Sequence, residues 1–268
     1  SSNRFSGVIP SNLGSLAAMT SLKVSANQLT GSLPASIGSL RSLQVIDVSS
    51  NALTGSIFSA AGSWGSVTTL DLSFNQFTGS IPSSIGKTLS LLRLHAGSNA
   101  LGGSLPSSMG NLTNLLSLSL SNNGITGAIP AWLTNLTTSL YVDLSSNNLT
   151  GSLPFDLGRL SSLDALDLSS NAIVGTIPRS VLKLSLIRSF NMDSNMVSGS
   201  VPSEIGSLSS LEILRLSGNQ MDGTLPTSVS SLHALATLDL SSNNISGSIL
   251  TSIGTLALVQ SLSLSSNS

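Results

Sequence analysis

The stretch VDLSSNNLTGSLPFDLGRLSSL (Val142–Leu163) decides the fold, because nearly the same pattern recurs along the whole chain. Its asparagine, Asn147, has a counterpart every 24 residues, with no insertion or deletion over eleven periods. A glycine lies four residues after this asparagine in every period. All nine prolines lie seven residues after it, and Phe58 and Leu250 take that place in the other two periods. A fixed period of about 20 to 50 residues indicates a repeat protein, so we expect about eleven stacked repeats.

Each repeat predicts two short strands and a turn. The residues before each asparagine alternate between apolar and polar, which is typical of a strand with one buried face, and stacked copies form a parallel main sheet of a solenoid. We expect Leu94 and Val142 to be buried, and Arg93, His95 and Tyr141 to be exposed. The element LTGSLP predicts a second, shorter strand that ends at proline, which has no amide hydrogen. The rest of the repeat fits a short 3₁₀ or α turn.

The recurring asparagine stands where the chain turns off the main strand. Its side-chain amide donates and accepts hydrogen bonds, so it can satisfy turn backbone groups that would otherwise be buried without a partner. We therefore expect a structural ladder of asparagines, made of Asn27, Asn51, Asn75, Asn99, Asn123, Asn147, Asn171, Asn195, Asn219 and Asn243.

Composition argues against several classes of partner. Charged residues make up 8% of the 268 residues and the net charge is −1, so neither nucleic acid nor an anionic membrane surface is indicated as a partner. Serine, with 61 copies, makes the surface polar through hydroxyl groups. No apolar run reaches the roughly 18 residues of a membrane span, so we expect the chain itself not to cross a membrane. Cysteine is absent, which excludes a disulfide framework and thiolate metal ligands.

The sequence favours a non-enzymatic chain with no catalytic residue, cofactor or metal site. The two histidines, His95 and His233, are almost six periods apart and take different places in the repeat, so they cannot share a site on a rigid rod. The tripeptide GKT at Gly86–Thr88 lacks the glycine of a phosphate-binding loop, because Ile81 stands where that glycine is needed.

The open face of the main sheet holds the candidate binding residues. Most of its positions are small or hydroxyl residues, whereas interfaces draw their energy from Tyr, Trp and Arg. Our ligand-binding candidates are Phe74, Arg93, His95, Tyr141, Asp143, Arg188 and Arg215. The first five fall on four consecutive strands and predict one patch. The last two, with Asp193 and Glu212, form a looser cluster that is either a second contact site or a salt-bridged surface.

Four Asn-x-Ser/Thr sequons are candidates for N-glycosylation if the protein is secreted. They start at Asn111, Asn135, Asn148 and Asn244.

The pattern in Val142–Leu163 resembles the plant-type extracellular leucine-rich repeat of receptor-like kinases, receptor-like proteins and polygalacturonase-inhibiting proteins. The resemblance covers the whole chain. It implies a leucine-rich repeat solenoid of the α/β class, mostly β with short 3₁₀ or α turns. Its parallel sheet would line the concave face, with a short second sheet beside it. The resembling proteins carry cysteine-paired caps, so we expect residues 1–268 to form a single array, uncapped at both ends, that is a fragment of a longer chain.

The resemblance also implies a function. It favours a non-enzymatic protein or peptide recognition module, the ligand-binding ectodomain of a receptor-like glycoprotein at the cell surface or outside the cell, with a peptide ligand and a co-receptor as partners. In resembling receptors, two arginines two residues apart on one strand often hold a ligand carboxylate, and no strand here has that pair. A secreted glycosidase-inhibitor-like protein is the first alternative.

Ice binding is the second alternative. Outward hydroxyl residues of the second strand predict two rows, Thr30, Thr54, Thr78, Thr126 and Thr150 beside Ser32, Ser56, Ser80, Ser104 and Ser152. Regular, uncharged threonine rows on a β-solenoid resemble those of ice-binding proteins, but the same LTGSIP consensus also occurs in receptors without that activity.

Overall fold

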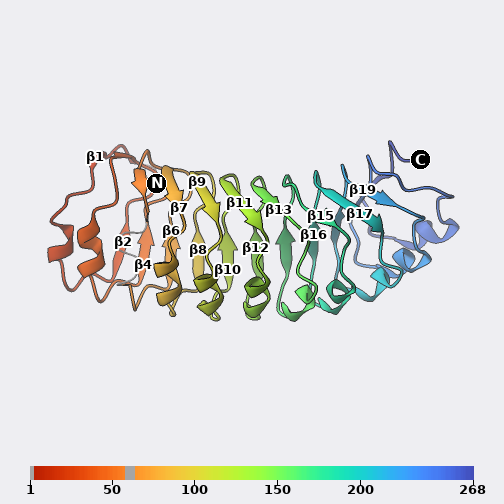
Figure 1. Cartoon of the computed structure of the whole chain (residues 1–268), viewed down its shortest axis with the longest axis horizontal. Coiled ribbons are helices and arrows are strands. Elements are labelled where there is room, and N and C mark those ends of the chain that lie inside the picture. Colours follow the sequence, from red (N-terminus) through yellow and green to blue (C-terminus); the bar gives the residue numbers. More distant parts are fainter. Residues whose placement is uncertain (1–2, 58–63) are drawn as a thin grey trace. The chain divides into compact units, whose positions relative to one another are not determined.

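The computed structural model describes residues 3–57 and 64–268, and it consists of two compact units, Ser1–Gly127 and Ala128–Ser268. We call them unit 1 and unit 2 and describe each by itself. Phe58 lies outside the described residues. Within each unit every repeat contributes a short strand to a parallel main sheet (Figure 1), so the predicted repeat solenoid is confirmed. The single array over residues 1–268 stays a prediction.

Unit 1 has five main strands that follow one another in sequence order across the sheet. They are β2 (Ser21–Lys23), β4 (Val45–Asp47), β6 (Thr69–Asp71), β8 (Arg93–His95) and β10 (Ser117–Ser119). Equivalent residues of successive repeats pair directly, as Leu70 does with Leu94 and Leu94 with Leu118. Side chains 24 residues apart therefore stand next to each other on the same face of the sheet.

Unit 2 repeats this arrangement with six main strands in sequence order. They are β12 (Tyr141–Asp143), β14 (Ala165–Asp167), β16 (Ser189–Asn191), β18 (Ile213–Arg215), β20 (Thr237–Asp239) and β21 (Ser261–Ser263). Strand β14 pairs with β12 on one side and β16 on the other, again with a register of 24 residues.

The second strands are shorter and pair with a different register. In unit 1 they are β1 (Ser6–Val8), β3 (Gln28–Thr30), β5 (Thr54–Ser56), β7 (Gln76–Ser80), β9 (Ala100–Ser104) and β11 (Gly124–Ala128). In unit 2 they are β13 (Asn148–Thr150), β15 (Val174–Gly175), β17 (Met196–Ser200) and β19 (Gln220–Asp222). Ser56 pairs with Thr78, and Ser104 with Thr126. Each serine therefore faces the threonine 22 residues ahead, which shifts the predicted rows by two residues from one strand to the next.

Where the structure describes it, the outer side of a repeat is a single 3₁₀ turn, as the mixed apolar spacing predicts. The turns are η1 (Leu13–Ser15), η2 (Ala35–Ser39), η4 (Ser83–Lys87) and η5 (Ser107–Asn111) in unit 1. In unit 2 they are η6 (Ala131–Asn135), η7 (Leu157–Arg159), η8 (Arg179–Lys183), η9 (Ile205–Ser207), η10 (Thr227–Ser231) and η11 (Thr251–Thr255). Proline stands immediately before several of them with extended backbone angles, for example Pro82 at φ −78° and ψ 151°.

The core lies between the main sheet and these turns, and aliphatic side chains fill it. Leu94, Val142 and Leu144 are fully buried, as the alternation in the sequence predicts. Trp64 and Phe77 are among the largest buried side chains. Because these residues recur with the repeat, each repeat buries its apolar side against its neighbours, which is how solenoids obtain their stability.

The recurring asparagine is built into the backbone of the turn. The side-chain amide of Asn171 donates to the carbonyls of Leu168 (3.1 Å) and Ser169 (3.1 Å) in its own turn. It also donates to Leu144 O (3.0 Å) of the previous repeat, and its Oδ1 accepts from Leu149 N (2.9 Å). One side chain thus joins two repeats and satisfies four backbone groups.

The same four contacts recur along the chain. They are made by Asn51, Asn75, Asn99, Asn123, Asn195, Asn219 and Asn243. Asn27 and Asn147 each donate to two carbonyls of their own turn.

Two positions with positive φ shape each repeat. The residue before the asparagine is left-handed in both units, for example Ser50 (φ 53°) and Ser170 (φ 54°). The glycine of the second strand is left-handed as well. At Gly103 (φ 71°) an added Cβ would stand 3.0 Å from Ser80 Cβ, so both the backbone angle and the close approach require glycine.

Candidate functional site: the open face of the main sheet

The open face of the main sheet carries the side chains that differ most from repeat to repeat. The first and third residues of each main strand point to this face, which we call the main-sheet face, while the middle residue points into the core. In unit 1, for example, the first residue of β8 is the exposed Arg93. The first residue of β6 is Thr69, and that of β10 is Ser117. The backbone is the same in each repeat, so the chemistry of the face depends on these side chains.

Phe74 is an apolar side chain held away from the core of unit 1. It follows β6 by three residues and takes the left-handed turn position, with φ 54°. Most other repeats have serine there, and Phe74 is 63% exposed. A large aromatic in this position offers a partner apolar area that the fold itself does not use.

His95 lies between two polar partners from neighbouring strands. Its Nδ1 is 3.8 Å from Asp71 Oδ2 on β6, and its Nε2 is 2.8 Å from Ser117 Oγ on β10. The side chains of His95 and Asp71 are 30% and 28% exposed. Burial raises the pKa of Asp71, but the interaction with His95 and the hydrogen bonds from Ser73 outweigh it, so the pKa lies below its usual range.

In unit 2, Tyr141 and Asp143 form a second polar pair on the same strand, β12. The phenol of Tyr141 donates to Asp143 Oδ2 at 3.3 Å. Asp143 Oδ1 accepts from the Ser145 amide (3.0 Å) and hydroxyl (2.7 Å). Burial, and then the charge of Asp143, raises the pKa of Tyr141 to about 12.

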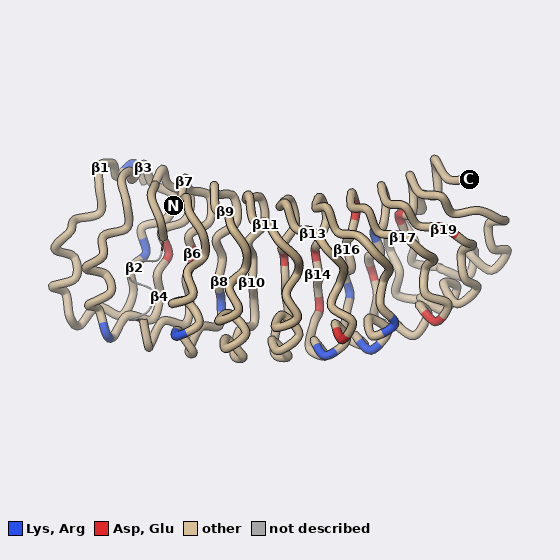
Figure 2. The backbone as a smooth tube through the Cα atoms, viewed as in Figure 1, with Lys and Arg blue, Asp and Glu red and all other residues tan. Residues whose placement is uncertain are grey.

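Arginines and carboxylates pair on or beside the main strands that follow in unit 2. Figure 2 marks the backbone positions of Lys and Arg in blue and of Asp and Glu in red. Arg188 contacts Asp164 (3.2 Å) on one side and Glu212 (3.4 Å) on the other. Arg215 lies 4.0 Å from Asp193, whose Oδ1 accepts from the Ser217 amide at 2.7 Å. Burial raises the pKa of Asp193, partly offset by its bonds with Ser217. These contacts match the salt-bridged alternative for this cluster.

The structure therefore brings the predicted residues together in separate groups. Phe74, Arg93 and His95 belong to unit 1, and Tyr141 and Asp143 to unit 2, so a single patch made of all five stays a prediction. Sequence reasoning missed Asp71 and Ser117 as partners of His95. Their spacing was a usable signal. Asp71 lies one repeat before His95. Ser117 lies two residues before Ser119, which is one repeat after His95.

Aspartates of the main-sheet face interact mainly with serine. Ser49, Ser145, Ser169 and Ser241 each donate a hydroxyl hydrogen bond to the aspartate two residues earlier, and Ser73 does the same with Asp71. In the described ranges, no group of three or more His, Cys, Asp and Glu side chains is arranged to hold a metal ion.

The asparagines of all four sequons are exposed. Asn111 and Asn135 are the last residues of η5 and η6, Asn148 starts β13, and Asn244 follows the ladder asparagine Asn243. They lie outside the main strands, so glycans there would leave the main-sheet face uncovered. Their modification stays a prediction.

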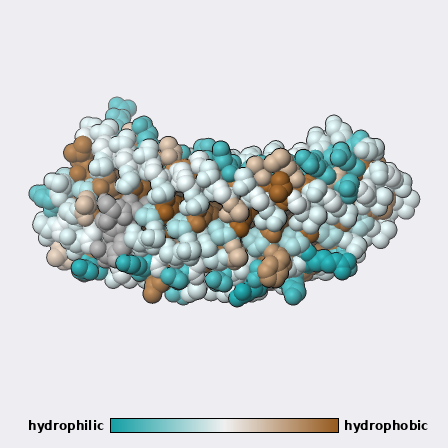
Figure 3. Space-filling view, viewed as in Figure 1, coloured by the Kyte–Doolittle hydropathy of each residue, from teal (hydrophilic) through white to brown (hydrophobic). Residues whose placement is uncertain are grey.

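The second sheet presents a different, more uniform surface. Thr54, Ser56, Thr78 and Ser80 are exposed. Between Gln28 and Gly127 the outward positions of these strands hold no charged residue. Much of the face seen in Figure 3 is pale, the colour of intermediate hydropathy.

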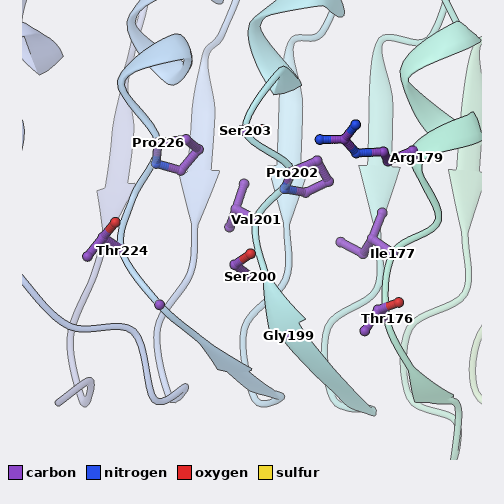
Figure 4. A pocket seen from close by; sticks show the side chains of 11 residues that line it. Thr176, Ile177, Arg179, Gly199, Ser200, Val201, Pro202, Ser203, Thr224 and Pro226 are labelled. Carbon is purple, nitrogen blue, oxygen red and sulfur yellow. The ribbon is translucent and has the colours of Figure 1, made fainter.

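A shallow groove of about 620 Å³ lies along the second sheet of unit 2 (Figure 4). Hydroxyl residues Thr176, Ser200 and Thr224 line it from three successive repeats. At its edge Arg179 Nη2 is paired with Glu204 Oε1 at 3.1 Å. The groove therefore offers hydroxyl groups and aliphatic surface, and the charge at its edge is already neutralised.

Known families and structures agree with this architecture. Family models described as leucine rich repeat match residues 113–173, and also 66–88, 210–232 and 234–256. No curated protein matches the chain. In the part of the chain that the structure describes, no helix has the length and apolar character needed to cross a membrane.

Solved structures of plant receptors resemble the chain over nearly its whole length. The Arabidopsis receptor kinase HAESA, in complex with the peptide hormone IDA and the co-receptor SERK1, is 34% identical with a TM-score of 0.93, over 99% of this chain and 45% of HAESA. PEPR1 in the PEPR1–AtPEP1 structure is 34% identical with a TM-score of 0.89, over 99% of this chain and 41% of that one.

A plant ice-binding protein is also similar, at 28% identity and a TM-score of 0.79, over 91% of this chain and 80% of that one. The chain thus spans less than half the length of the two receptor structures, but most of the length of the ice-binding protein. Repeat spacing, sheet architecture and these matches agree on a leucine-rich repeat solenoid that is similar to the plant extracellular type.

Proposed function

We propose that the chain is a recognition module that binds an extended peptide or protein segment along the main-sheet face, outside the cell, as part of a receptor-like protein. The exposed Phe74 is the observation that carries this proposal, with Arg93 on the next strand. An exposed aromatic and a cation on an otherwise small, hydroxyl-rich face are the side chains from which interfaces draw energy.

The similar receptor structures support a peptide or protein segment as the ligand. HAESA is described with a peptide hormone and a co-receptor, and another similar structure, at 30% identity, is a plant peptide hormone receptor, RGFR1, in complex with RGF2. We extend this to the present chain as a peptide ligand and a co-receptor. The chain lacks two arginines two residues apart on a main strand, so we expect its ligand to be held by other contacts than a carboxylate clamp.

Selection from a displayed random peptide library tests the proposal. Peptides that bind the folded chain are expected to lose about tenfold in affinity, or about 1.4 kcal/mol, when Phe74→Ser or Arg93→Ser is introduced. Serine is the residue most repeats carry at the Phe74 position, so the first variant is compatible with the fold.

Thr54→Tyr on the second sheet is the matched control, and it is expected to leave the affinity unchanged. Peptides that bind both main-sheet variants as tightly as the parent, but lose affinity for the control, would place recognition on the other sheet. The glycosidase-inhibitor alternative stays a prediction. The full-length gene separates the two, because a receptor needs a transmembrane helix and an inhibitor ends after its cap.

Ice binding is a second candidate function for the second sheet. Its exposed, uncharged hydroxyl residues in unit 1 and the similarity to a plant ice-binding protein favour it. The two-residue register shift counts against it, because equivalent threonines are offset between neighbouring strands. An ice-recrystallisation assay decides: activity removed by Thr78→Tyr supports the candidate, and no activity in the folded parent rejects it.

A further inference from the structure

Three side chains on neighbouring main strands of unit 1 form a linear chain of polar contacts. Asp71 stands on β6, His95 on β8 and Ser117 on β10. One ring nitrogen of His95 faces the carboxylate at 3.8 Å, and the other lies 2.8 Å from the serine hydroxyl. Carboxylate, imidazole and hydroxyl follow each other in the order that activates a serine nucleophile, and such a set is recognised by geometry and not by sequence position.

The carboxylate is well placed to orient the imidazole. Asp71 Oδ1 accepts from the Ser73 amide at 3.1 Å, which fixes the carboxylate while Oδ2 faces the ring. A carboxylate beside Nδ1 favours the tautomer with its proton on Nδ1, so Nε2 is left to accept the proton of Ser117 Oγ. The lowered pKa of Asp71 keeps the carboxylate charged at neutral pH.

Ser117 is half-buried, and its neighbour on β8 is a cation. Ser117 pairs with Arg93 in the ladder, and the Arg93 side chain is exposed on the same face. A guanidinium on the neighbouring residue is a suitable donor for a developing oxyanion. Gly97 follows His95 on the same side. A Cβ there would stand 3.2 Å from Ser121 O and Oγ, which is a tight contact, and glycine leaves this space without a side chain.

We propose that Ser117 is a nucleophile activated by His95 and that this face hydrolyses simple, unhindered esters. Ser117 Oγ bonds to the ester carbonyl carbon as its proton passes to His95 Nε2. The carbon–oxygen bond to the alcohol breaks, and the alcohol leaves with that proton. Water then attacks the acyl-serine with His95 as base, which releases the carboxylic acid and restores Ser117. Asp71 is a positioning residue. This activity is additional to the recognition function and does not depend on it.

Labelling of the intact chain with a fluorophosphonate probe, read by peptide mass spectrometry, tests the proposal. Ser117 Oγ bonds to phosphorus and fluoride leaves, so the modified residue is identified directly. We expect Ser117 to be labelled about tenfold or more above the other serines, and His95→Gln to remove this excess. Turnover of p-nitrophenyl acetate should fall in parallel in Ser117→Ala and His95→Gln.

The matched control is Ser189→Ala, because Ser189 takes the same strand position on β16 where no histidine lies beside it. It should change neither labelling nor turnover. Two results would overturn the proposal. One is uniform labelling of many serines. The other is labelling of Ser117 that persists in His95→Gln while this variant unfolds at the same urea concentration as the parent.

The pH profile of labelling tests the role of Asp71. The charged groups around His95 are Asp71 on β6 and Arg93 on β8, and β10 contributes none. In Asp71→Asn the imidazolium loses a stabilising charge, so the pH midpoint of labelling should move to lower pH. An unchanged midpoint would remove Asp71 from the proposal.

Discussion

The turn after each main strand and the open face of that strand lie a few residues apart, yet they differ in how their sequence varies. At the turn, asparagine recurs in every repeat and makes the same contacts in both units. On the face, the third strand residue is Asp71, His95 and Ser119 in three consecutive strands. The turn must satisfy buried backbone groups, whereas the face only has to remain compatible with a strand, so residues for binding are expected on the face.

The largest effect should come from the core beneath that face. Leu214 is fully buried on β18, so Leu214→Ala should lower the free energy of unfolding by about 2 to 5 kcal/mol. Leu186, 55% exposed in the same unit, is the control, and Leu186→Ala should change stability much less. Urea unfolding measures both. Equal midpoint shifts would mean that the strand alternation does not separate core from surface.

The turn should be the next most sensitive region. Asn171→Ala leaves four backbone groups without their side-chain partner, so we expect a loss of about 1 to 3 kcal/mol in unfolding free energy. Asn244→Ala, an exposed asparagine one residue after the ladder, should stay within about 0.5 kcal/mol of the parent. If the two variants unfold alike, the ladder does not carry stability.

Much of this contrast follows from the sequence, and some of it does not. The 24-residue period gives the repeat, the alternation gives buried Leu94 and Val142, and the recurring asparagine gives the turn. The two-residue shift of the second sheet was not predicted, because the repeat period does not determine the pairing register between neighbouring strands. The link from His95 to Ser117 was not predicted either. The spacing brings the two residues to neighbouring strands, but the direction of the ring depends on the rotamer.

On the face itself, Tyr141 should titrate abnormally. It is the single tyrosine of the chain, so absorbance of the phenolate reports it alone, with a pKa of about 12 in the parent. Asp143→Asn should move this pKa down toward the ordinary value of about 10, because it removes the neighbouring charge. The raised pKa means that the stabilisation associated with the neutral phenol is full below pH 10 and is lost as pH rises through about 12. A parent that titrates near 10 would contradict the pair.

The smallest effect is expected for the exposed ion pairs. Arg188→Ala removes contacts with Asp164 and Glu212, but Arg188 is 62% exposed, so the change in unfolding free energy should not exceed about 1 kcal/mol. The difference from the parent should shrink in high salt. A loss comparable to that of Asn171→Ala would show that this part of the face is structural.

The central claim, that the face recognises and the turn supports, is tested most directly by mapping a bound peptide. A selected peptide carrying a photo-crosslinker is irradiated on the folded chain, and the attached residues are identified by mass spectrometry. The account predicts crosslinks on the first and third residues of main strands, such as Arg93–His95 of β8 or Ile213–Arg215 of β18. Crosslinks confined to second-sheet residues such as Thr54–Ser56 would contradict it.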